Sequence, residues 1–108
     1  THCYSVHPSM PTIAEQRAQC PFAREVVVRW MLQPGSTYED AKEHYEPFDR
    51  LVDPDPASRS EVADLIAAAL ARSLPVTTVV NNKAEGSSPL SIGLLAKAIR
   101  DRLPAPPT

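Results

Sequence analysis

The chain has 108 residues, a length that accommodates one domain. Hydrophobic residues make up 43% and charged residues 22%, the composition of a globular chain rather than a disordered one. No apolar run approaches the roughly 20 residues that span a bilayer, no targeting leader precedes the folded pattern, and a net charge of −2 without a block of like charges speaks against nonspecific nucleic-acid binding. We therefore expect a cytoplasmic globular protein.

The first third of the chain predicts two strands with a helix between them. Alternating β-branched and aromatic residues predict a short strand over residues 3–7. Thr12 and Glu15 have the capping-box spacing that opens a short helix. The nearly continuous apolar run over residues 25–32, closed by residues 34–35, is typical of a parallel strand covered on both faces.

Two further helices are predicted before the last strand. Ser and Glu at the ends of residues 36–39 form a capping box for a short surface helix that reaches Tyr45. The Asp- and Pro-rich segment 48–57 supplies turns. A third box over residues 58–61 opens the longest helix, with Arg59, Asp64 and Arg72 on its polar face and one apolar stripe formed by Val62, Leu65, Ile66, Ala69 and Leu70.

The C-terminal part predicts a strand, a turn and a final helix. Residues 75–80 form a second β-branched run that indicates a buried strand. Ser88 stands where an N-cap belongs and Pro89 where the first helical residue belongs. Residues 103–108 are expected to be a disordered tail. The helix before that tail is predicted to bury Ile92, Leu95, Ala96, Ile99 and Leu103.

The predicted order is strand, helix, strand, helix, helix, strand, helix. Strands that alternate with helices indicate βαβ units with right-handed crossovers, and hence an α/β protein with a parallel sheet. Three strands leave both sheet edges exposed, and such edges invite pairing with another strand. The pattern therefore predicts missing neighbours.

A pattern known from one family is carried by four segments: Tyr4–His7, Val28–Met31 with Tyr38, Tyr45–Arg50 and Val80–Ser91. Together they resemble the YecE-like family, the domain of unknown function 72. Its members end in a strand that leads to a paired Asn and then to a terminal helix, and here the most specific match is residues 80–91. The resemblance covers essentially the whole chain, residues 1–108, as the C-terminal portion of a family domain. It implies a TIM-type (β/α) barrel of which this chain supplies about the last three βα units.

Functional groups of a βα barrel lie at the carboxyl ends of its strands and in the loops that follow. Buried Val-rich strands have little use for a cation or an amide unless a polar pocket is present, because an unpaired buried polar group costs several kcal/mol. The turn before the last helix adds a cation and the free amides of a helix N-terminus, which favour an anion. The predicted ligand-binding residues are His7, Arg29, Asn81, Asn82, Lys83, Ser87 and Ser88.

A structural interpretation of the same residues stays open. Asn81 and Asn82 are also suited to holding a turn through bonds to the backbone, and Arg29 to pairing with a carboxylate. Because strand side chains alternate, the two Asn side chains are not expected to face the same side. Trp30 is expected to be a packing residue.

The sequence predicts neither a metal site nor a catalytic thiol. His44 with Asp49, Asp53 and Asp55 has suitable ligand chemistry but no recognised ligand spacing. Cys3 and Cys20 allow at most one bridge and are expected to be free thiols.

Three functions compete at this point. The first is a YecE-like barrel protein that binds a small polar or anionic ligand at its strand ends. The second is a metal-dependent hydrolase or phosphodiesterase whose remaining site residues lie in missing N-terminal strands. The third is a noncatalytic module that self-associates. No catalytic residue and no cofactor follow from the sequence, so an enzyme and a binding protein are both compatible with it.

Overall fold

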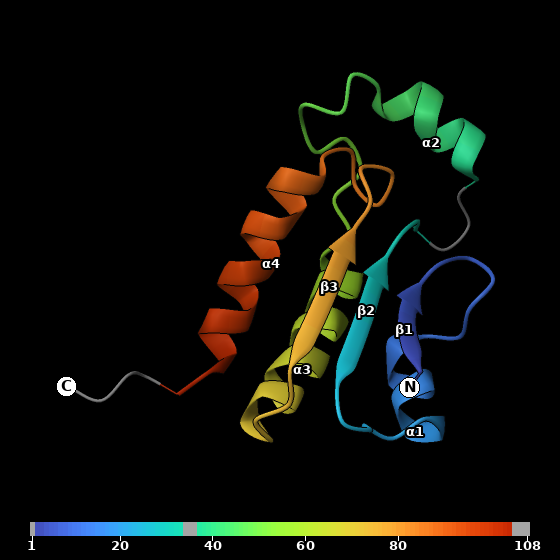
Figure 1. Cartoon of the computed structure of the whole chain (residues 1–108). Coiled ribbons are helices and arrows are strands. Elements are labelled where there is room, and N and C mark those ends of the chain that lie inside the picture. Colours follow the sequence, from blue (N-terminus) through green and yellow to red (C-terminus); the bar gives the residue numbers. More distant parts are fainter. Residues whose placement is uncertain (1, 34–36, 105–108) are drawn as a thin grey trace.

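The computed structural model describes residues 2–33 and 37–104, which form a three-stranded sheet and four helices (Figure 1). Their order along the chain is the order that the sequence predicts. No helix of these residues is long and apolar enough to cross a membrane. The elements are β1 (Cys3–Val6), α1 (Ile13–Gln19), β2 (Val26–Trp30), α2 (Tyr38–Tyr45), α3 (Pro56–Ala71), β3 (Val76–Val80) and α4 (Ser88–Arg102).

The sheet is parallel throughout, with the strand order β1-β2-β3. Val28 in the central strand is in register with Tyr4 on one side and Thr78 on the other. The two Val-rich runs are therefore neighbouring parallel strands, as predicted. The sheet is open: the described residues form neither a barrel nor an evident part of one.

Only one face of the sheet is covered. Figure 1 shows α1, α3 and α4 behind or beside the sheet, with nothing in front of it. Side chains alternate accordingly: Val26, Val28 and Trp30 are buried, whereas Val27 is half-buried and Arg29 is exposed. The prediction of strands covered on both faces was wrong. The apolar run of β2 contains Arg29, which side-chain alternation places on the open face.

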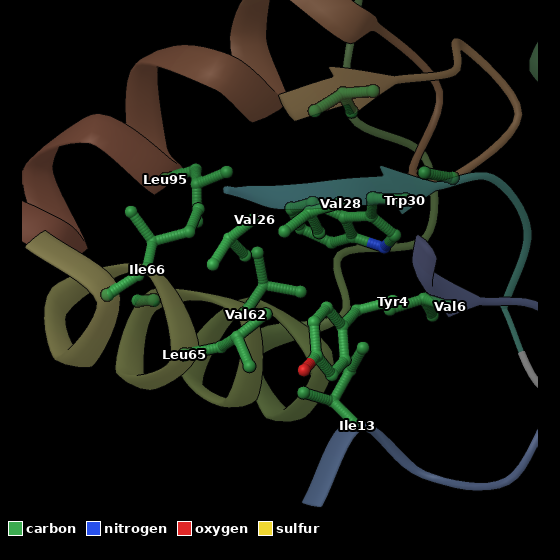
Figure 2. Packing of buried hydrophobic residues seen from close by; sticks show 14 residues of the cluster. Tyr4, Val6, Ile13, Val26, Val28, Trp30, Val62, Leu65, Ile66 and Leu95 are labelled. Carbon is green, nitrogen blue, oxygen red and sulfur yellow. The ribbon is translucent and has the colours of Figure 1, made fainter. Parts of the chain in front are cut away.

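The main core lies between the covered face and α3 (Figure 2). Trp30 and Val28 have no exposed surface, and neither has Val62 on the facing helix. Burying an aliphatic side chain of this kind contributes about 1.5–3 kcal/mol, so this layer supplies most of the apolar stabilisation. Trp30 is a packing residue, as expected, and its indole Nε1 has no hydrogen-bond partner among the described residues.

Three helices begin at residues other than those predicted. The N-cap of α2 is Thr37, whose hydroxyl accepts from the Asp40 amide, while Ser36 lies outside the described residues, as do residues 34–35. The N-cap of α3 is Asp55 rather than Ser58, because Pro56 at the first position has φ suited to a helix and moves the helix start three residues toward the N-terminus. The N-cap of α4 is Ser87. The capping box of α1, Thr12 with Glu15, is confirmed.

Two predicted apolar stripes are only partly buried. In α3, Leu70 is 41% exposed although the rest of its stripe is buried. In α4, Leu95 is buried but Ile92 is 48% exposed, and Leu103 also faces outward. The buried position one turn before Leu95 belongs to Ser91, so α4 is rotated to bring a hydroxyl inward. Of the predicted tail, residues 105–108 lie outside the described part.

A second, smaller cluster lies beyond the sheet, where α2 packs on the loop that follows it. Leu32, Ala41 and Tyr45 form it. The Tyr45 hydroxyl donates to Asp53 Oδ2 over 2.8 Å. Burial, followed by this hydrogen bond, raises the pKa of the Tyr45 phenol above its usual range.

Tyr45→Phe tests this raised pKa through stability. A phenol whose pKa is raised by folding stabilises the protein below its unfolded pKa of about 10, and that contribution is lost as the pH rises further. At about pH 8 the variant should lose roughly 1 kcal/mol with its hydrogen bond. Between about pH 8 and 11 it should lose less stability than the wild type in urea unfolding. If the variant and the wild type lost the same stability over this pH range, the loss would come from groups that both share, such as Tyr4. That result would contradict the raised pKa of Tyr45.

Candidate functional site

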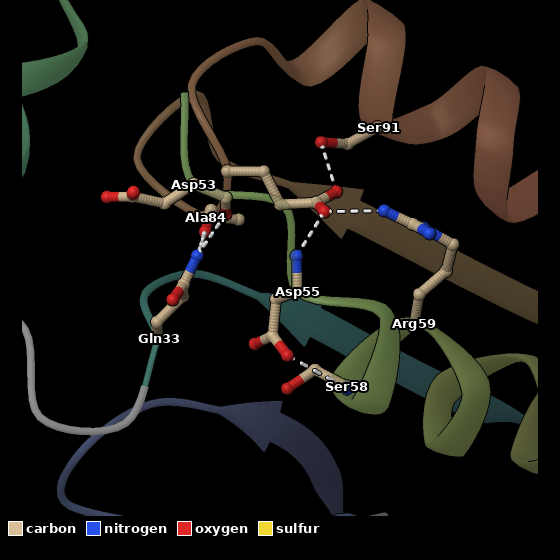
Figure 3. A network of polar contacts seen from close by, with 8 residues as sticks. Gln33, Asp53, Asp55, Ser58, Arg59, Ala84 and Ser91 are labelled. Carbon is tan, nitrogen blue, oxygen red and sulfur yellow. Dashed lines mark hydrogen bonds and ion pairs between the residues drawn. The ribbon is translucent and has the colours of Figure 1, made fainter. Parts of the chain in front are cut away.

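The segments that follow the three strands all leave the sheet at its carboxyl edge, since the three arrows point the same way in Figure 1. In parallel α/β proteins ligands bind at this edge. One side chain ties two of the loops together: Gln33, after β2, donates through Nε2 to the Ala84 carbonyl over 3.1 Å and to the Asp53 carbonyl (Figure 3).

A polar hollow of about 280 Å³ lies on the helix-free face near this edge, between β1 and β2. Arg29 and His7, two predicted site residues, both line it. Arg29 points there because it pairs in register with Ser5 on the same open face. None of the lining residues is acidic: they are Ser5, His7, Ser9, Met10, Arg29 and Met31.

The loop after β1 sets the orientation of the His7 ring. Its Nδ1 lies 3.0 Å from the Ser9 amide nitrogen and 2.7 Å from Ser9 Oγ. Because a backbone amide only donates, Nδ1 is the acceptor, and the neutral ring carries its proton on Nε2. The Nδ1 lone pair of His7 is therefore engaged inside this turn.

These groups give the hollow the chemistry of an anion site. Arg29 carries five N–H donors and a permanent charge, and its exposed position means that folding does not remove it from water. Hydrogen bonds from a guanidinium to an anion are about twice as strong as neutral ones. The structural alternative was that Arg29 pairs with a carboxylate. Among the described residues, no ion pair joins Arg29 to an acidic side chain.

The other predicted site residues lie together in the turn between β3 and α4. Asn81 Oδ1 accepts from the Lys83 amide over 2.8 Å, and Asn82 Oδ1 accepts from the Ser88 amide over 2.8 Å. The paired Asn thus holds the turn and caps the helix, as the structural interpretation proposes. Ser87 is buried, and Lys83 Nζ lies 6.0 Å from the centre of the Phe48 ring. None of these residues lines the Arg29 hollow.

The most buried charge in this region is one that the sequence interpretation missed. Glu85 has no exposed surface, and its carboxylate accepts from three donors (Figure 3). The Asp55 amide donates over 2.7 Å and Arg59 over 2.6 Å to Oε2, while the Ser91 hydroxyl donates over 2.7 Å to Oε1. One carboxylate therefore joins the start of α3 to the first turn of α4.

The backbone around Glu85 is seated against the loop that precedes α3. The Glu85 carbonyl accepts from the amides of Val52 and Asp53. Gly86 has φ of +128°, and a Cβ there would lie 2.5 Å from the Arg50 carbonyl oxygen. Only glycine fits such a close approach at this φ.

A signal for Glu85 was present in the sequence but incomplete. Its partner Arg59 was assigned to the polar face of a helix with Asp64 and Arg72; those two are exposed, but the Arg59 side chain is only 16% exposed. A carboxylate directly before a glycine, in a turn bounded by two buried elements, is the pattern to look for. Glu85 and Arg59 are 26 positions apart in the sequence, so no local pattern connects them.

The acidic residues around His44 do not converge. His44 Nε2 lies 3.8 Å from Asp53 Oδ2, which already accepts from Tyr45. Across the described residues, no three His, Cys, Asp or Glu side chains are placed to hold a metal ion. Cys3 and Cys20 are free thiols.

No family model matches the chain, and neither a curated protein nor a solved structure matches it. The resemblance to the YecE-like family therefore stays a prediction. What is known of the site is the geometry of the chain's own residues.

Glu85→Gln tests the buried carboxylate. Removing one charge of a buried pair leaves Arg59, only 16% exposed, without its counter-ion. The free energy of unfolding should fall by about 3 kcal/mol or more. The matched control is Asp101→Asn, the same acid-to-amide change in an exposed pair with Lys97, which should alter stability by less than about 0.5 kcal/mol. Similar losses in both variants, measured by urea unfolding, would show that Glu85 has no special role.

Proposed function

We propose that this chain binds a small anionic ligand in the hollow between β1 and β2. The observation that carries the proposal is the convergence of Arg29 and the hydroxyl- and imidazole-bearing loop after β1 on a hollow without acidic residues. The hollow, of about 280 Å³, is close to the lower end of the range of roughly 300–1,000 Å³ that small-molecule sites occupy.

The location favours function over stability. Arg29 stands on the open face of the central strand, where it supports no core contact and no ion pair among the described residues. A cation retained at the carboxyl end of a parallel strand is typical of ligand binding. Asn81 and Asn82 shape the neighbouring turn through bonds to its backbone. Contact of a ligand with Asn81, Asn82, Lys83, Ser87 and Ser88 stays a prediction.

We also propose that the chain is the C-terminal part of a YecE-like barrel. Helices on a single face of a parallel sheet agree with a barrel, whose helices form an outer ring and whose inner face carries the strand-end site. The metal-dependent hydrolase alternative places its remaining residues outside this chain and gains no support here.

Arg29→Gln should separate binding from stability. Inorganic phosphate is the probe, titrated into labelled protein while amide chemical shifts are followed. Losing a charged donor should weaken phosphate binding at least about tenfold, in line with about 1.5–3 kcal/mol for such a bond. The unfolding free energy should change by less than about 1 kcal/mol, as expected at an exposed position.

The control for this experiment is Arg24→Gln, an exposed arginine outside the hollow. It removes the same charge from the chain and should leave phosphate binding within about twofold of wild type, because a distant exposed charge is screened by salt. If both variants weakened phosphate binding equally, the loss in Arg29→Gln would come from the change in net charge and not from a specific contact. A large loss of stability in Arg29→Gln would make that residue structural.

A second candidate function, the self-association module, is favoured by one surface. Asn81 N donates to the Trp30 carbonyl, so the alternate backbone groups of β3 point to its open edge. Beside this edge lies an apolar groove of about 340 Å³ between α3 and α4, into which Leu70 and Ile92 project. Leu70 and Ile92 are large hydrophobic residues that are 41% and 48% exposed there.

A second copy fits this edge, because an isologous pair would place β3 against β3 and join the two grooves across the axis. Ile92→Glu should then weaken self-association at least about tenfold in sedimentation equilibrium. Leu94→Glu is the matched control: it introduces the same charge at a similarly exposed position outside the groove. A monomeric wild type would contradict this candidate, and would agree with an edge reserved for a barrel strand.

A further inference from the structure

We infer that the chain has a second binding site, separate from the Arg29 hollow, for a small organic cation that consists of a primary ammonium group on a short alkyl chain. The site is a hollow of about 150 Å³ between the β1–α1 loop and the first turns of α3. Apart from the His7 ring, the one charged side chain among the described residues that line it is Glu61. The hollow therefore has the opposite charge to the Arg29 hollow, and its ligand is a different molecule.

Glu61 carries its charge at this hollow without a partner from the protein. It is half-buried, and no ion pair or side-chain hydrogen bond among the described residues includes it. The two arginines on the helices that border the hollow have other partners: Arg59 binds Glu85 over 2.6 Å, and Arg17 lies 5.2 Å from the centre of the Phe22 ring. Moving a carboxylate partly out of water costs free energy unless a cation compensates it. A cationic ligand supplies that compensation.

The hydroxyl groups beside Glu61 favour an ammonium group as this cation. Ser58 is 8% exposed and lies three residues before Glu61 on α3, so the two side chains share one face of the helix and both line the hollow. Thr12 lines it from the start of α1, where its hydroxyl also caps that helix. A primary ammonium has three N–H donors and no acceptor, while carboxylate and hydroxyl oxygens accept. The polar part of the lining therefore matches an ammonium ion in charge and in hydrogen bonding.

The rest of the lining is apolar, and the backbone that carries it is fixed. Gln16, which is 2% exposed, donates through Nε2 to the carbonyls of Ser5 and Pro11 over 2.8 Å each. A loop held in this way is preformed, so a ligand spends little binding energy on ordering it. A cavity of about 150 Å³ holds benzene, and a butyl chain is smaller. The apolar side chains available to such a chain are Val6, Met10, Pro11 and Ile13.

Three probes divide this ligand into its parts. Butylammonium has the charge and the alkyl chain, 1-butanol has the chain alone, and the ammonium ion has the charge alone. In titrations followed by amide chemical shifts at one pH and one salt concentration, butylammonium should bind at least about tenfold more tightly than either other probe. If a probe with one part bound as tightly as butylammonium, or if butylammonium did not bind, the inference would be overturned.

Glu61→Gln keeps the shape of the side chain and removes its charge. The variant should bind butylammonium at least about tenfold more weakly than wild type, while 1-butanol binding changes by less than about twofold. The matched control is Glu25→Gln, the same substitution at an exposed acid outside the hollow, which should leave butylammonium binding within about twofold of wild type. Equal weakening by the two variants would assign the effect to net charge and overturn the inference.

Two further measurements keep the outcome decisive. If Glu61→Gln does not fold, nuclear Overhauser effects between the butyl protons and the Met10 and Ile13 methyl groups are expected in wild-type protein at saturation. Their absence would place the ligand elsewhere and overturn the inference. Inorganic phosphate is titrated separately, and its affinity for Glu61→Gln should stay within about twofold of wild type. Failure of the cation site is thereby distinguished from failure of the proposed anion site.

Discussion

The Glu85 carboxylate is the interaction on which the arrangement at the carboxyl edge depends. A charge with no exposed surface persists only when its lone pairs are satisfied, and here a backbone amide, a guanidinium and a hydroxyl satisfy them. Their donors come from α3 and α4, so neither helix can shift without breaking a bond to Glu85. The rotation of α4 that turns Ser91 inward and Ile92 outward follows from the same contact.

The fold was largely predictable because its signals are local. Apolar runs placed the strands, the Thr12 box started α1 correctly, and alternation of strands and helices indicated the parallel sheet. Helix starts at Asp55 and Thr37 were missed because several residues in each segment can cap, and packing chooses among them. One-sided cover was missed because a short β-branched run looks alike whether one face or two are buried.

The candidate site was predictable in part, for a related reason. Arg29 and His7 follow from strand position alone, and the structure brings them to one hollow. Asn81 was predicted to share that hollow, but its amide oxygen bonds the Lys83 amide two residues on, a local bond that competes with any distant partner. To predict the role of Glu85, one must know which helix lies opposite it in the fold. Hydrophobic periodicity along the sequence does not contain that information.

The two edges of the sheet differ in a way that limits how copies of this chain can assemble. Val6 turns its carbonyl to β2, so the Ser5 amide and carbonyl face outward at the β1 edge, where the Gln16 carboxamide bonds both, as the peptide of a neighbouring strand would. The β3 edge carries no such substitute among the described residues. Fibrous growth requires two complementary edges on each copy, one to receive and one to offer. With the β1 edge closed by the chain's own side chain, edge-to-edge pairing of copies is confined to β3 and cannot continue into a fibre.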